Sequence, residues 1–372
     1  MIDRLPHICF LAPNAFPMLA NDGKIPFAGG AELQQVMIAK GLVQRGYRVS
    51  MICLDFGQSD RCEIEGVTVY KAFRPKDGIP ILRFIWPRLT GIWRCLKRAR
   101  ADIYYQRAGS MLTGVMAAFC RQHGKRSIFA MAGESKFRFG RDRWLYEFGI
   151  KHVDSVVVQN SGQARFVREV VGRASVLIPN IYQVARPVMG TASRRYILWV
   201  GMIRQIKRPD LFLDLVQSLP GLRFVMVGGP GVGEAPLYEA ISERAAKLPN
   251  LDFVGFVPYQ EVNSYFDSAM VFVNTSDSEG FPNTFLQSWA RGVPTVSFVD
   301  SGAWMNGEPV GVLVKSVAEM SKAISALVEN SKERSRLGQV SKAYVELNHA
   351  PQRVLDLYDD LLRHMMQRNG PE

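Results

Sequence analysis

Residues 271–287 of the chain read Val271-Phe272-Val273-Asn274-Thr275-Ser276-Asp277-Ser278-Glu279-Gly280-Phe281-Pro282-Asn283-Thr284-Phe285-Leu286-Gln287. The apolar start predicts a buried strand, and the end predicts a helix that stops at Gly292 and Pro294 before the next strand. A helix that begins just beyond the carboxyl end of a strand presents free backbone N–H groups and favours a phosphate. The Glu279 carboxylate and the Gln287 amide accept hydrogen bonds from sugar hydroxyls. The segment therefore predicts recognition of a nucleotide-sugar, with a plain strand-turn-helix and a solvated glutamate as the alternative.

Short apolar runs alternate with helix-length segments in both halves of the chain. Predicted strands of the first half are Ile8–Ala12, Val49–Leu54, Ile103–Tyr105, Ser127–Ala130, Ser155–Val158 and Ser175–Ile178, with a helix over Ala31–Gln44. Those of the second half are Tyr196–Val200, Arg223–Val227, Leu251–Val254, Val271–Asn274 and Thr295–Phe298, with a terminal helix over Gln352–Met366. The alternation predicts an α/β protein with two doubly wound parallel sheets. We expect the linker between them over Gln183–Arg195.

Length and composition are those of an ordinary two-domain globular protein. The chain has 372 residues, of which 47% are hydrophobic and 22% charged. Its five cysteines are scattered and predict reduced thiols, and hence a cytoplasmic protein without disulfides or a cysteine metal cage. The polar start, Met1–Pro6, predicts no signal peptide. No apolar run reaches the roughly 18 residues that a membrane-spanning helix needs.

The excess positive charge lies in the first half of the chain. Residues 1–180 contain 27 Lys and Arg against 14 Asp and Glu, a net charge of 27 − 14 = +13. Residues 181–372 contain 19 against 20, which gives 19 − 20 = −1 and agrees with the total of +12. This asymmetry indicates that the first half meets an anionic partner, such as a membrane face, a lipid diphosphate or nucleic acid.

On these residues the chain resembles glycosyltransferase family 4. The family consists of retaining sugar transferases of the GT-B architecture, in which two Rossmann-like domains face across a cleft. The resemblance runs from about His7 to Gly311 and is most specific in Glu279–Gln287. It implies an acceptor- and membrane-side domain over residues 1–185, a donor domain over 195–348, and a terminal helix over 350–368 that crosses back to the first domain.

Two acids lie eight positions apart in the corresponding segment of the family. The resemblance implies that Glu279, at the first position, contacts the donor sugar. The second position holds Gln287, which would bind the ribose without the added strength of a charged acceptor. Pro282, Asn283 and Thr284 form the predicted helix start that would face the donor phosphates.

The loop after the first strand of the second half carries three positive charges, in Gly201–Pro209. In the family an arginine follows the glycine directly and a lysine comes five residues later, both directed at the donor diphosphate. Lys207 occupies the lysine position, whereas Met202 replaces the arginine. We hypothesise that Arg204 supplies the displaced charge, with an exposed cationic turn as the alternative.

Further loops contribute weaker predictions. Gly29 and Gly30 permit close backbone approach at a helix start, although paired glycines commonly form only a turn. No Gly-x-Gly-x-x-Gly pattern accompanies them, which argues against a nicotinamide enzyme. Gly229 belongs to a predicted close-approach turn under the nucleotide, and by resemblance Phe256 lies near the base. The catalytic histidine frequent in the first domain of the family is missing from 130–136, where Glu134 is the acceptor-side candidate.

The resemblance implies transfer with retention. Lys207, Arg204 and the helix start would stabilise the departing diphosphate, while Glu279 would position the sugar. No protein nucleophile is required if the acceptor attacks on the face that the diphosphate leaves. The histidines lie where structural roles are expected, and no ligand cluster has metal-binding spacing, so we predict no metal and no cofactor.

A basic amphipathic segment, Arg74–Arg100, contains eight Lys and Arg against one acid. On a helical wheel one face carries Ile81, Ile85, Leu89, Ile92, Trp93 and Leu96, and the other carries Arg83, Arg94, Lys97 and Arg98. Pro87 predicts where the helix starts. Such a helix suits the headgroup layer of an anionic membrane, and the alternative is a core-packed helix with a solvated basic face.

The sequence thus predicts a retaining glycosyltransferase with a nucleotide-sugar donor and a glycan or lipid-linked acceptor. We expect it to be cytoplasmic, with peripheral contact to the inner membrane face through the basic segment. A catalytically weak or inactive nucleotide-sugar-binding scaffold is the alternative, favoured by Met202 and Gln287. No nucleic-acid partner is predicted, because no reading motif or aromatic-basic interleaving is present.

Overall fold

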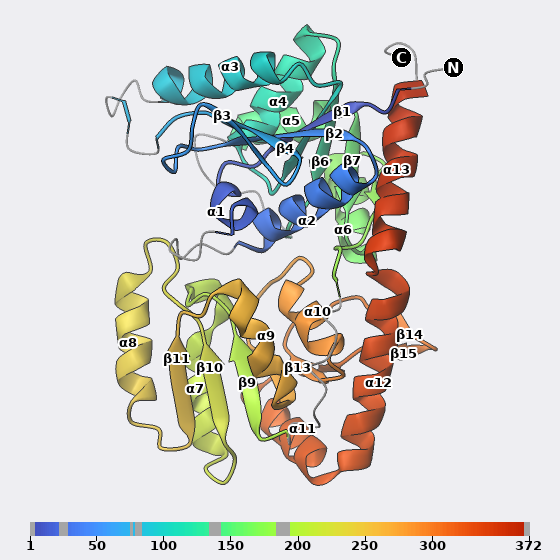
Figure 1. Cartoon of the computed structure of the whole chain (residues 1–372). Helices are drawn as coiled ribbons and strands as arrows, with labels where there is room; N and C mark the ends of the chain where they lie inside the picture. Colours follow the sequence, from blue (N-terminus) through green and yellow to red (C-terminus); the bar gives the residue numbers. More distant parts are fainter. Residues whose placement is uncertain are drawn as a thin grey trace. The chain divides into compact units, whose positions relative to one another are not determined.

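The computed structural model describes residues 4–21, 29–74, 77–78, 84–133, 143–183 and 194–367. The chain forms two compact units (Figure 1). The first consists of Met1–Ile181 together with Pro351–Glu372, and the second of Tyr182–Ala350. The predicted linker lies largely outside the described residues. Each unit contains its own predominantly parallel sheet, as the alternation of apolar runs predicts.

The sheet of the first unit has eight strands in the order β3-β4-β2-β1-β5-β6-β7-β8. Their bounds are β1 His7–Leu11, β2 Arg48–Cys53, β3 Arg61–Ile64, β4 Val67–Lys71, β5 Ile103–Arg107, β6 Arg126–Ala130, β7 Ser155–Val158 and β8 Val176–Leu177. All pairs are parallel except β3 with β4. The β3–β4 hairpin escaped prediction. Its edge strand is half-exposed and polar, and its tight turn uses two positive-φ residues, Glu65 and Gly66.

Helices cover both faces of this sheet. α1 (Phe16–Leu19), α2 (Gly30–Gln44) and α13 (Pro351–Gln367) pack on one face, and α3 (Thr90–Ala99), α4 (Met111–Gln122) and α5 (Arg143–His152) on the other. The short helical segments η1 (Phe84–Leu89), α6 (Ser161–Phe166) and η2 (Val167–Val171) complete the described part of the unit. The terminal helix α13 is anchored by apolar burial. Its Tyr358 is 2% exposed and shares a 3.1 Å hydrogen bond with Tyr105 of β5.

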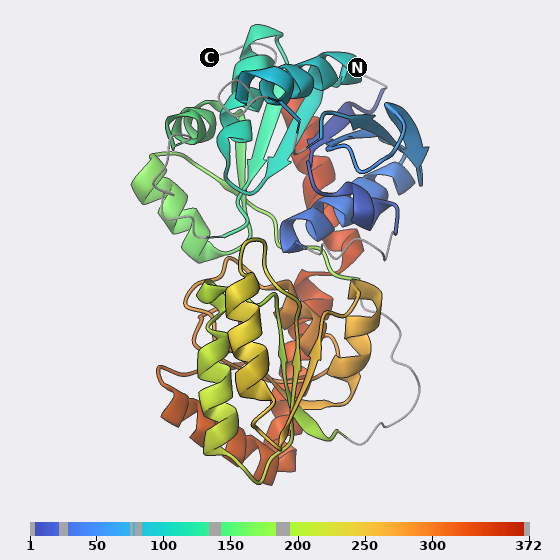
Figure 2. The same ribbon diagram turned by 90° about the vertical axis from the view of Figure 1, so that its left-hand side faces the viewer.

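The second unit contains a six-stranded parallel sheet in the order β11-β10-β9-β12-β13-β16. Its strands are β9 Tyr196–Val200, β10 Phe224–Val227, β11 Leu251–Gly255, β12 Ala269–Asn274, β13 Thr295–Ser297 and β16 Val312–Leu313, and β14 (Trp304–Met305) pairs with β15 (Glu308–Pro309) in a separate hairpin. One face is covered by α7 (Pro209–Ser218), α8 (Ala235–Ala245) and α11 (Val317–Glu329). The other is covered by α9 (Tyr259–Asp267), α10 (Asn283–Trp289) and α12 (Ser331–Asn348). Figure 2 shows α7 and α8 side by side.

The strand order of the second unit reverses between β9 and β12. The chain proceeds from β9 to β10 and β11 on one side, and then returns to place β12, β13 and β16 on the other. The loops that follow β9 and β12 therefore start from adjacent strand ends but run in opposite directions. In open parallel sheets such a reversal is where ligands bind. It is the part of the second unit in which the predicted donor-binding residues are expected.

One close helix contact of the second unit depends on a glycine. Gly338 of α12 lies against the turn after α10, and a β-carbon at this position would lie 2.2 Å from the carbonyl oxygen of Gly292. That oxygen belongs to the backbone, so the contact is relieved only if the helix moves.

We therefore expect Gly338→Ala to destabilise the second unit by about 1–3 kcal/mol, which corresponds to about 2–10 °C in Tm. Thermal unfolding followed by circular dichroism measures the change. Gly221→Ala is the matched control, because a β-carbon there meets no atom within 4 Å. Equal melting temperatures for the two variants would contradict the packing described here.

Candidate active site

Lys207 and Glu279 meet where the strand order of the second unit reverses. Lys207 ends the short helix η3 (Gln205–Lys207) after β9, and Glu279 lies in the loop after β12. The Lys207 ammonium forms a direct ion pair with the Glu279 carboxylate. Their side chains are 25% and 12% exposed, so the pair is partly shielded yet reachable from solvent. Two residues that the sequence assigned to one site are therefore in contact.

The Glu279 carboxylate is fixed by the residues that end β12. The Ser276 hydroxyl donates a 2.8 Å hydrogen bond to Glu279 Oε1, and the Asn274 amide approaches the same oxygen at 3.4 Å. Asn274 Oδ1 in turn accepts a 3.0 Å hydrogen bond from the Ser276 backbone N–H. These contacts hold the carboxylate in one orientation. The sequence pattern did not identify Asn274 and Ser276, whose one signal was their place at the end of a buried strand, Asn274 as its last residue and Ser276 two residues later.

A buried hydroxyl fixes the backbone of Lys207. Thr275 Oγ1 donates a 2.8 Å hydrogen bond to the Lys207 carbonyl oxygen and accepts one of 3.0 Å from Trp199 Nε1. Thr275 is fully buried, and the Trp199 indole is 2% exposed. The Asp277 N–H also donates to the Ile206 carbonyl at 2.9 Å. The loops after β9 and β12 are thus hydrogen-bonded to each other, so the positions of the lysine and the glutamate are set together.

The cations of the β9 loop have different partners. Arg208 forms ion pairs with Asp210 at 2.8 Å and with Asp277 at 3.3 Å. The stem of Arg204 packs over Gly231, where a β-carbon would lie 2.5 Å from Arg204 Cγ. Within the described part of the chain, the Arg204 guanidinium has neither an ion pair nor a hydrogen bond. Its charge is therefore available to a ligand, whereas that of Arg208 is neutralised.

The glycines after β10 are required by contacts between loops. A β-carbon on Gly228 would lie 1.9 Å from the Gly201 carbonyl oxygen, and one on Gly229 would lie 2.9 Å from Phe256 Cβ. Internal packing thus accounts for these glycines without a ligand. Phe256 itself is 41% exposed at the end of β11 and presents an aromatic ring beside Gly229. Contacts of Gly229 and Phe256 with a nucleotide stay predictions.

The predicted helix start is observed, and Gln287 lies buried in the second turn. Pro282 occupies the N-cap of α10, with Asn283 and Thr284 in its first turn and no side chain capping it. Gln287 is 3% exposed, and its amide donates a 3.2 Å hydrogen bond to Asn263 Oδ1 of α9. The structure thus ties Gln287 to a neighbouring helix, and its contact with a ribose stays a prediction.

The remaining predicted residues belong to the first unit. Gly29 is the N-cap of α2 and Gly30 its first residue. The Glu32 carboxylate folds back against Gly29, and burial raises the pKa of this carboxyl group. Glu134 lies outside the described residues, and its acceptor-side role stays a prediction. Among the residues that the structure describes, no group of three His, Cys, Asp or Glu side chains is placed to hold a metal ion.

The cysteine thiols and the helices of the described segments show neither disulfides nor membrane spans. All five cysteines are free, and burial raises the pKa of Cys9 to about 12, which keeps this thiol protonated. No helix in these segments has both the length and the apolar composition of a membrane span.

Replacing the Thr275 hydroxyl tests the link between the two loops. Thr275→Val leaves the Trp199 N–H and the Lys207 carbonyl without their buried partner, so we expect a loss of about 1–3 kcal/mol in unfolding free energy. Urea denaturation followed by tryptophan fluorescence measures this change. Thr275→Ser keeps the hydroxyl and should lose less than half as much. A serine variant as unstable as the valine variant would contradict a dominant role of the hydrogen bonds, because serine keeps the hydroxyl and loses only the methyl group.

Comparisons with known proteins follow the division into two units. Residues 29–180 match the family model described as "Glycosyl transferase 4-like domain", and residues 194–330 match "Glycosyl transferases group 1". A similar curated protein is the D-inositol 3-phosphate glycosyltransferase of Mycolicibacterium smegmatis, 27% identical over 207 residues, or 50% of this chain and 47% of that protein. The chain thus spans about half the length of this relative.

Solved structures share the fold over nearly the whole chain. Sucrose-phosphate synthase from Thermosynechococcus elongatus superposes with a TM-score of 0.79 at 16% identity, covering 98% of this chain and 100% of that one. HepE of Anabaena, solved with UDP and glucose, has a TM-score of 0.75 at 15% identity and covers 97% and 100%. The two domain matches and the shared fold identify the chain as a GT-B glycosyltransferase by family, one that resembles family 4.

Proposed function

We propose that this protein transfers a sugar from a nucleotide-sugar to a glycan or lipid-linked acceptor, with retention at the anomeric carbon. The observation that carries the proposal is the Lys207–Glu279 ion pair at the reversal of a parallel sheet, together with Arg204 of the same loop, whose guanidinium has no ion pair among the described residues. This position favours a nucleotide, the two cations favour its diphosphate, and the carboxylate favours sugar hydroxyls.

A uridine nucleotide is the donor that the comparisons favour. HepE of Anabaena, which shares the fold, was solved both with UDP and glucose and with UDP-glucose. We therefore propose a UDP-sugar as the donor of this protein and UDP as its product.

Because Lys207 and Glu279 are paired before the donor binds, the donor makes its contacts with them in a defined order. Without a ligand, Glu279 neutralises Lys207. A diphosphate carries more negative charge than the carboxylate, so it draws the flexible lysine ammonium toward itself. Glu279 then accepts hydrogen bonds from the sugar, while Ser276 keeps its carboxylate in place. Binding of the diphosphate thereby prepares the contact that orients the sugar.

The proposed chemistry needs no protein nucleophile. The acceptor oxygen forms a bond to the anomeric carbon as the bond from that carbon to the diphosphate oxygen breaks, and both events occur on the same face. The acceptor proton passes to the departing phosphate oxygen. Lys207 and Arg204 stabilise the negative charge that grows on the leaving diphosphate. This charge is larger in the transition state than in the bound donor, so its stabilisation lowers the barrier.

A binding protein without transferase activity is the second candidate. Met202 replaces the arginine that the family pattern places there, and Gln287 forms a buried contact with Asn263. Both features weaken the case for turnover but leave the diphosphate site intact. UDP binding together with no release of UDP from UDP-sugars, with any glycan or lipid extract as acceptor, would favour this candidate.

The three cations of the β9 loop make a matched set for UDP binding. We expect Lys207→Ala and Arg204→Ala each to weaken UDP affinity by about tenfold or more, since each removes a charge-assisted contact worth about 1.5–3 kcal/mol. Arg208→Ala should change it less than about threefold, because Asp210 and Asp277 already neutralise this guanidinium. Isothermal titration calorimetry measures the three constants. An unchanged affinity in Arg204→Ala would refute its role as the substitute for the missing arginine.

Turnover separates the role of Glu279 from that of the cations. Glu279→Gln removes the charge that orients the sugar but leaves Lys207 for the diphosphate, so UDP should bind at least as tightly as in the wild type. We expect its rate of UDP release from the donor to fall by about 100-fold or more. Coupled detection of UDP measures this rate, and the anomeric coupling constant of the product by NMR checks retention. An inverted product would contradict the same-face mechanism.

We also propose that the protein works at the inner face of the cytoplasmic membrane, where lipid-linked acceptors are available. The charge excess of the first half supports this location.

A further inference from the structure

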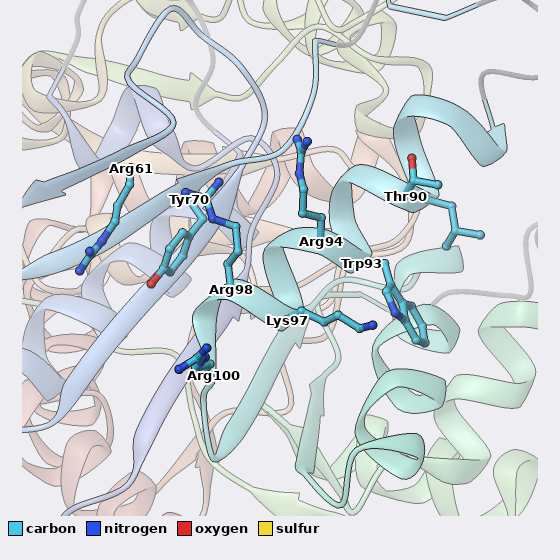
Figure 3. Close-up of a pocket in the computed structure, with 9 residues that line it drawn as sticks. Arg61, Tyr70, Thr90, Trp93, Arg94, Lys97, Arg98 and Arg100 are labelled. Atoms are coloured by element: carbon cyan, nitrogen blue, oxygen red, sulfur yellow. The ribbon is translucent and has the colours of Figure 1, made fainter.

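The first unit contains a basic groove along α3 that the donor chemistry does not use. The groove has a volume of about 860 Å³. It is lined by Arg61, Tyr70, Leu89, Thr90, Trp93, Arg94, Lys97, Arg98 and Arg100 (Figure 3). Five of these nine side chains are cationic and none is acidic. We call this surface the basic groove.

The five cations of the basic groove have no acidic partner among the described residues. None of them forms an ion pair or a hydrogen bond with another described side chain, and Arg98 lies over the Tyr70 ring at 5.8 Å. Of the carboxylates in the neighbouring cavity that Arg94 also lines, Asp55 is paired with Lys71 and Arg74 and Asp60 with Lys71, whereas Asp77 forms no ion pair among the described residues. Like charges at this density repel one another, so an anion bound between them relieves unfavourable electrostatic energy.

The helix spacing arranges these side chains in two rows. Arg94 and Arg98 lie one turn apart on one side of α3, while Trp93 and Lys97 lie one turn apart on the other (Figure 3). The groove therefore presents ammonium and guanidinium groups next to an indole. Arg100, at the left-handed C-cap of α3, also lines a second cavity of about 390 Å³, in which Arg4 and Arg48 lie together with the acid Asp102.

The structure shows which face of α3 can contact a membrane. Ile92 and Leu96, which belong to the predicted inserting face, are 1% and 0% exposed and pack in the core of the first unit. Insertion of that face into a bilayer would require unfolding of the unit, so this part of the amphipathic-helix prediction is wrong. The basic face is solvent-exposed, as the alternative expected. Arg83 and Ile81 lie outside the described residues.

We propose that the basic groove binds the phosphate headgroups of anionic phospholipids and holds the protein on a membrane surface by charge, without insertion. Anionic headgroups match the five cations. The Trp93 indole packs against Phe119 and His123 at ring-centroid distances of 5.2 and 5.9 Å, so it belongs to the core packing and does not enter lipid. Trp86, 64% exposed just before α3, is a ring suited to the interface. The inference rests on the membrane part of the proposed function and is independent of the donor site.

Flotation of the full chain with vesicles tests the groove. The vesicles contain phosphatidylcholine alone or with about 30% phosphatidylglycerol. We expect the wild type to bind only to the anionic vesicles. Arg94→Glu/Arg98→Glu should lower the partition coefficient at least tenfold, since each basic residue near such a surface raises this coefficient about fivefold. Arg165→Glu/Arg168→Glu is the matched control. It makes the same charge change at exposed residues of α6 and η2, outside the groove, and should lower the partition coefficient less than threefold.

Salt and competitors distinguish the mode of binding. Raising NaCl from 0.1 to 0.5 M should release the wild type, because surface charges are screened. Equal loss in the two double variants, binding that survives 0.5 M NaCl, equal binding to neutral vesicles, or preference for a single-stranded oligonucleotide at equal phosphate concentration would each overturn the proposal. UDP titration and thermal melting of the same variants report the donor site and the fold separately, so failure of the groove is distinguishable from failure of the proposed function.

Discussion

The hydrogen-bonded link between the loops after β9 and β12 is the constraint on which the candidate site depends. β9 and β12 are adjacent parallel strands, so their carboxyl ends lie together while the chain leaves them in opposite directions. Thr275 connects the two loops through the Lys207 carbonyl, and Ser276 holds the Glu279 carboxylate. A cation and an anion, 72 positions apart in the sequence, are thereby presented at fixed places. Recognition of the donor needs both groups, because the cation attracts the diphosphate and the carboxylate accepts hydrogen bonds from the sugar hydroxyls.

Charge is organised differently in the two units. In the β9 loop of the second unit, Glu279 pairs with Lys207 and Asp210 with Arg208, and Arg204 is the exception. Unpaired positive charge in the first unit is instead concentrated along α3. A paired cation acts on a ligand that approaches closely and displaces its partner. An unpaired cluster acts on an extended anionic surface at longer range. The proposed donor site and the basic groove thus use the same types of side chain, lysine and arginine, for different physical tasks.

Packing within the protein is enough to explain why some residues of the predicted binding pattern are present. Gly228 is required by the Gly201 carbonyl oxygen, and Gly229 by Phe256, whether or not a nucleotide is bound. Gln287 occupies a position where the family pattern has an acid, yet it bonds to Asn263. A neutral amide suits such a buried contact because it carries no desolvated charge. Glycine pairs and single polar residues therefore carry less functional information than the ion pair, whose partners come from distant segments.

Periodicity in the sequence determined the alternation of strands and helices, and with it the two parallel sheets, because apolar runs of strand length are needed wherever a strand is buried on both faces. The position after a buried strand also identified Glu279 and the start of α10, and the resemblance to family 4 identified Lys207. Tertiary structure alone decided the hairpin β3–β4, whose polar edge has no apolar run to mark it. It alone decided that Thr275 and Ser276 fix the site, and that Ile92 and Leu96 of α3 face the core rather than lipid. The local sequence shows which side chains are apolar. Whether such a side chain is buried in the core or faces lipid depends on other segments, which only folding brings into contact with it.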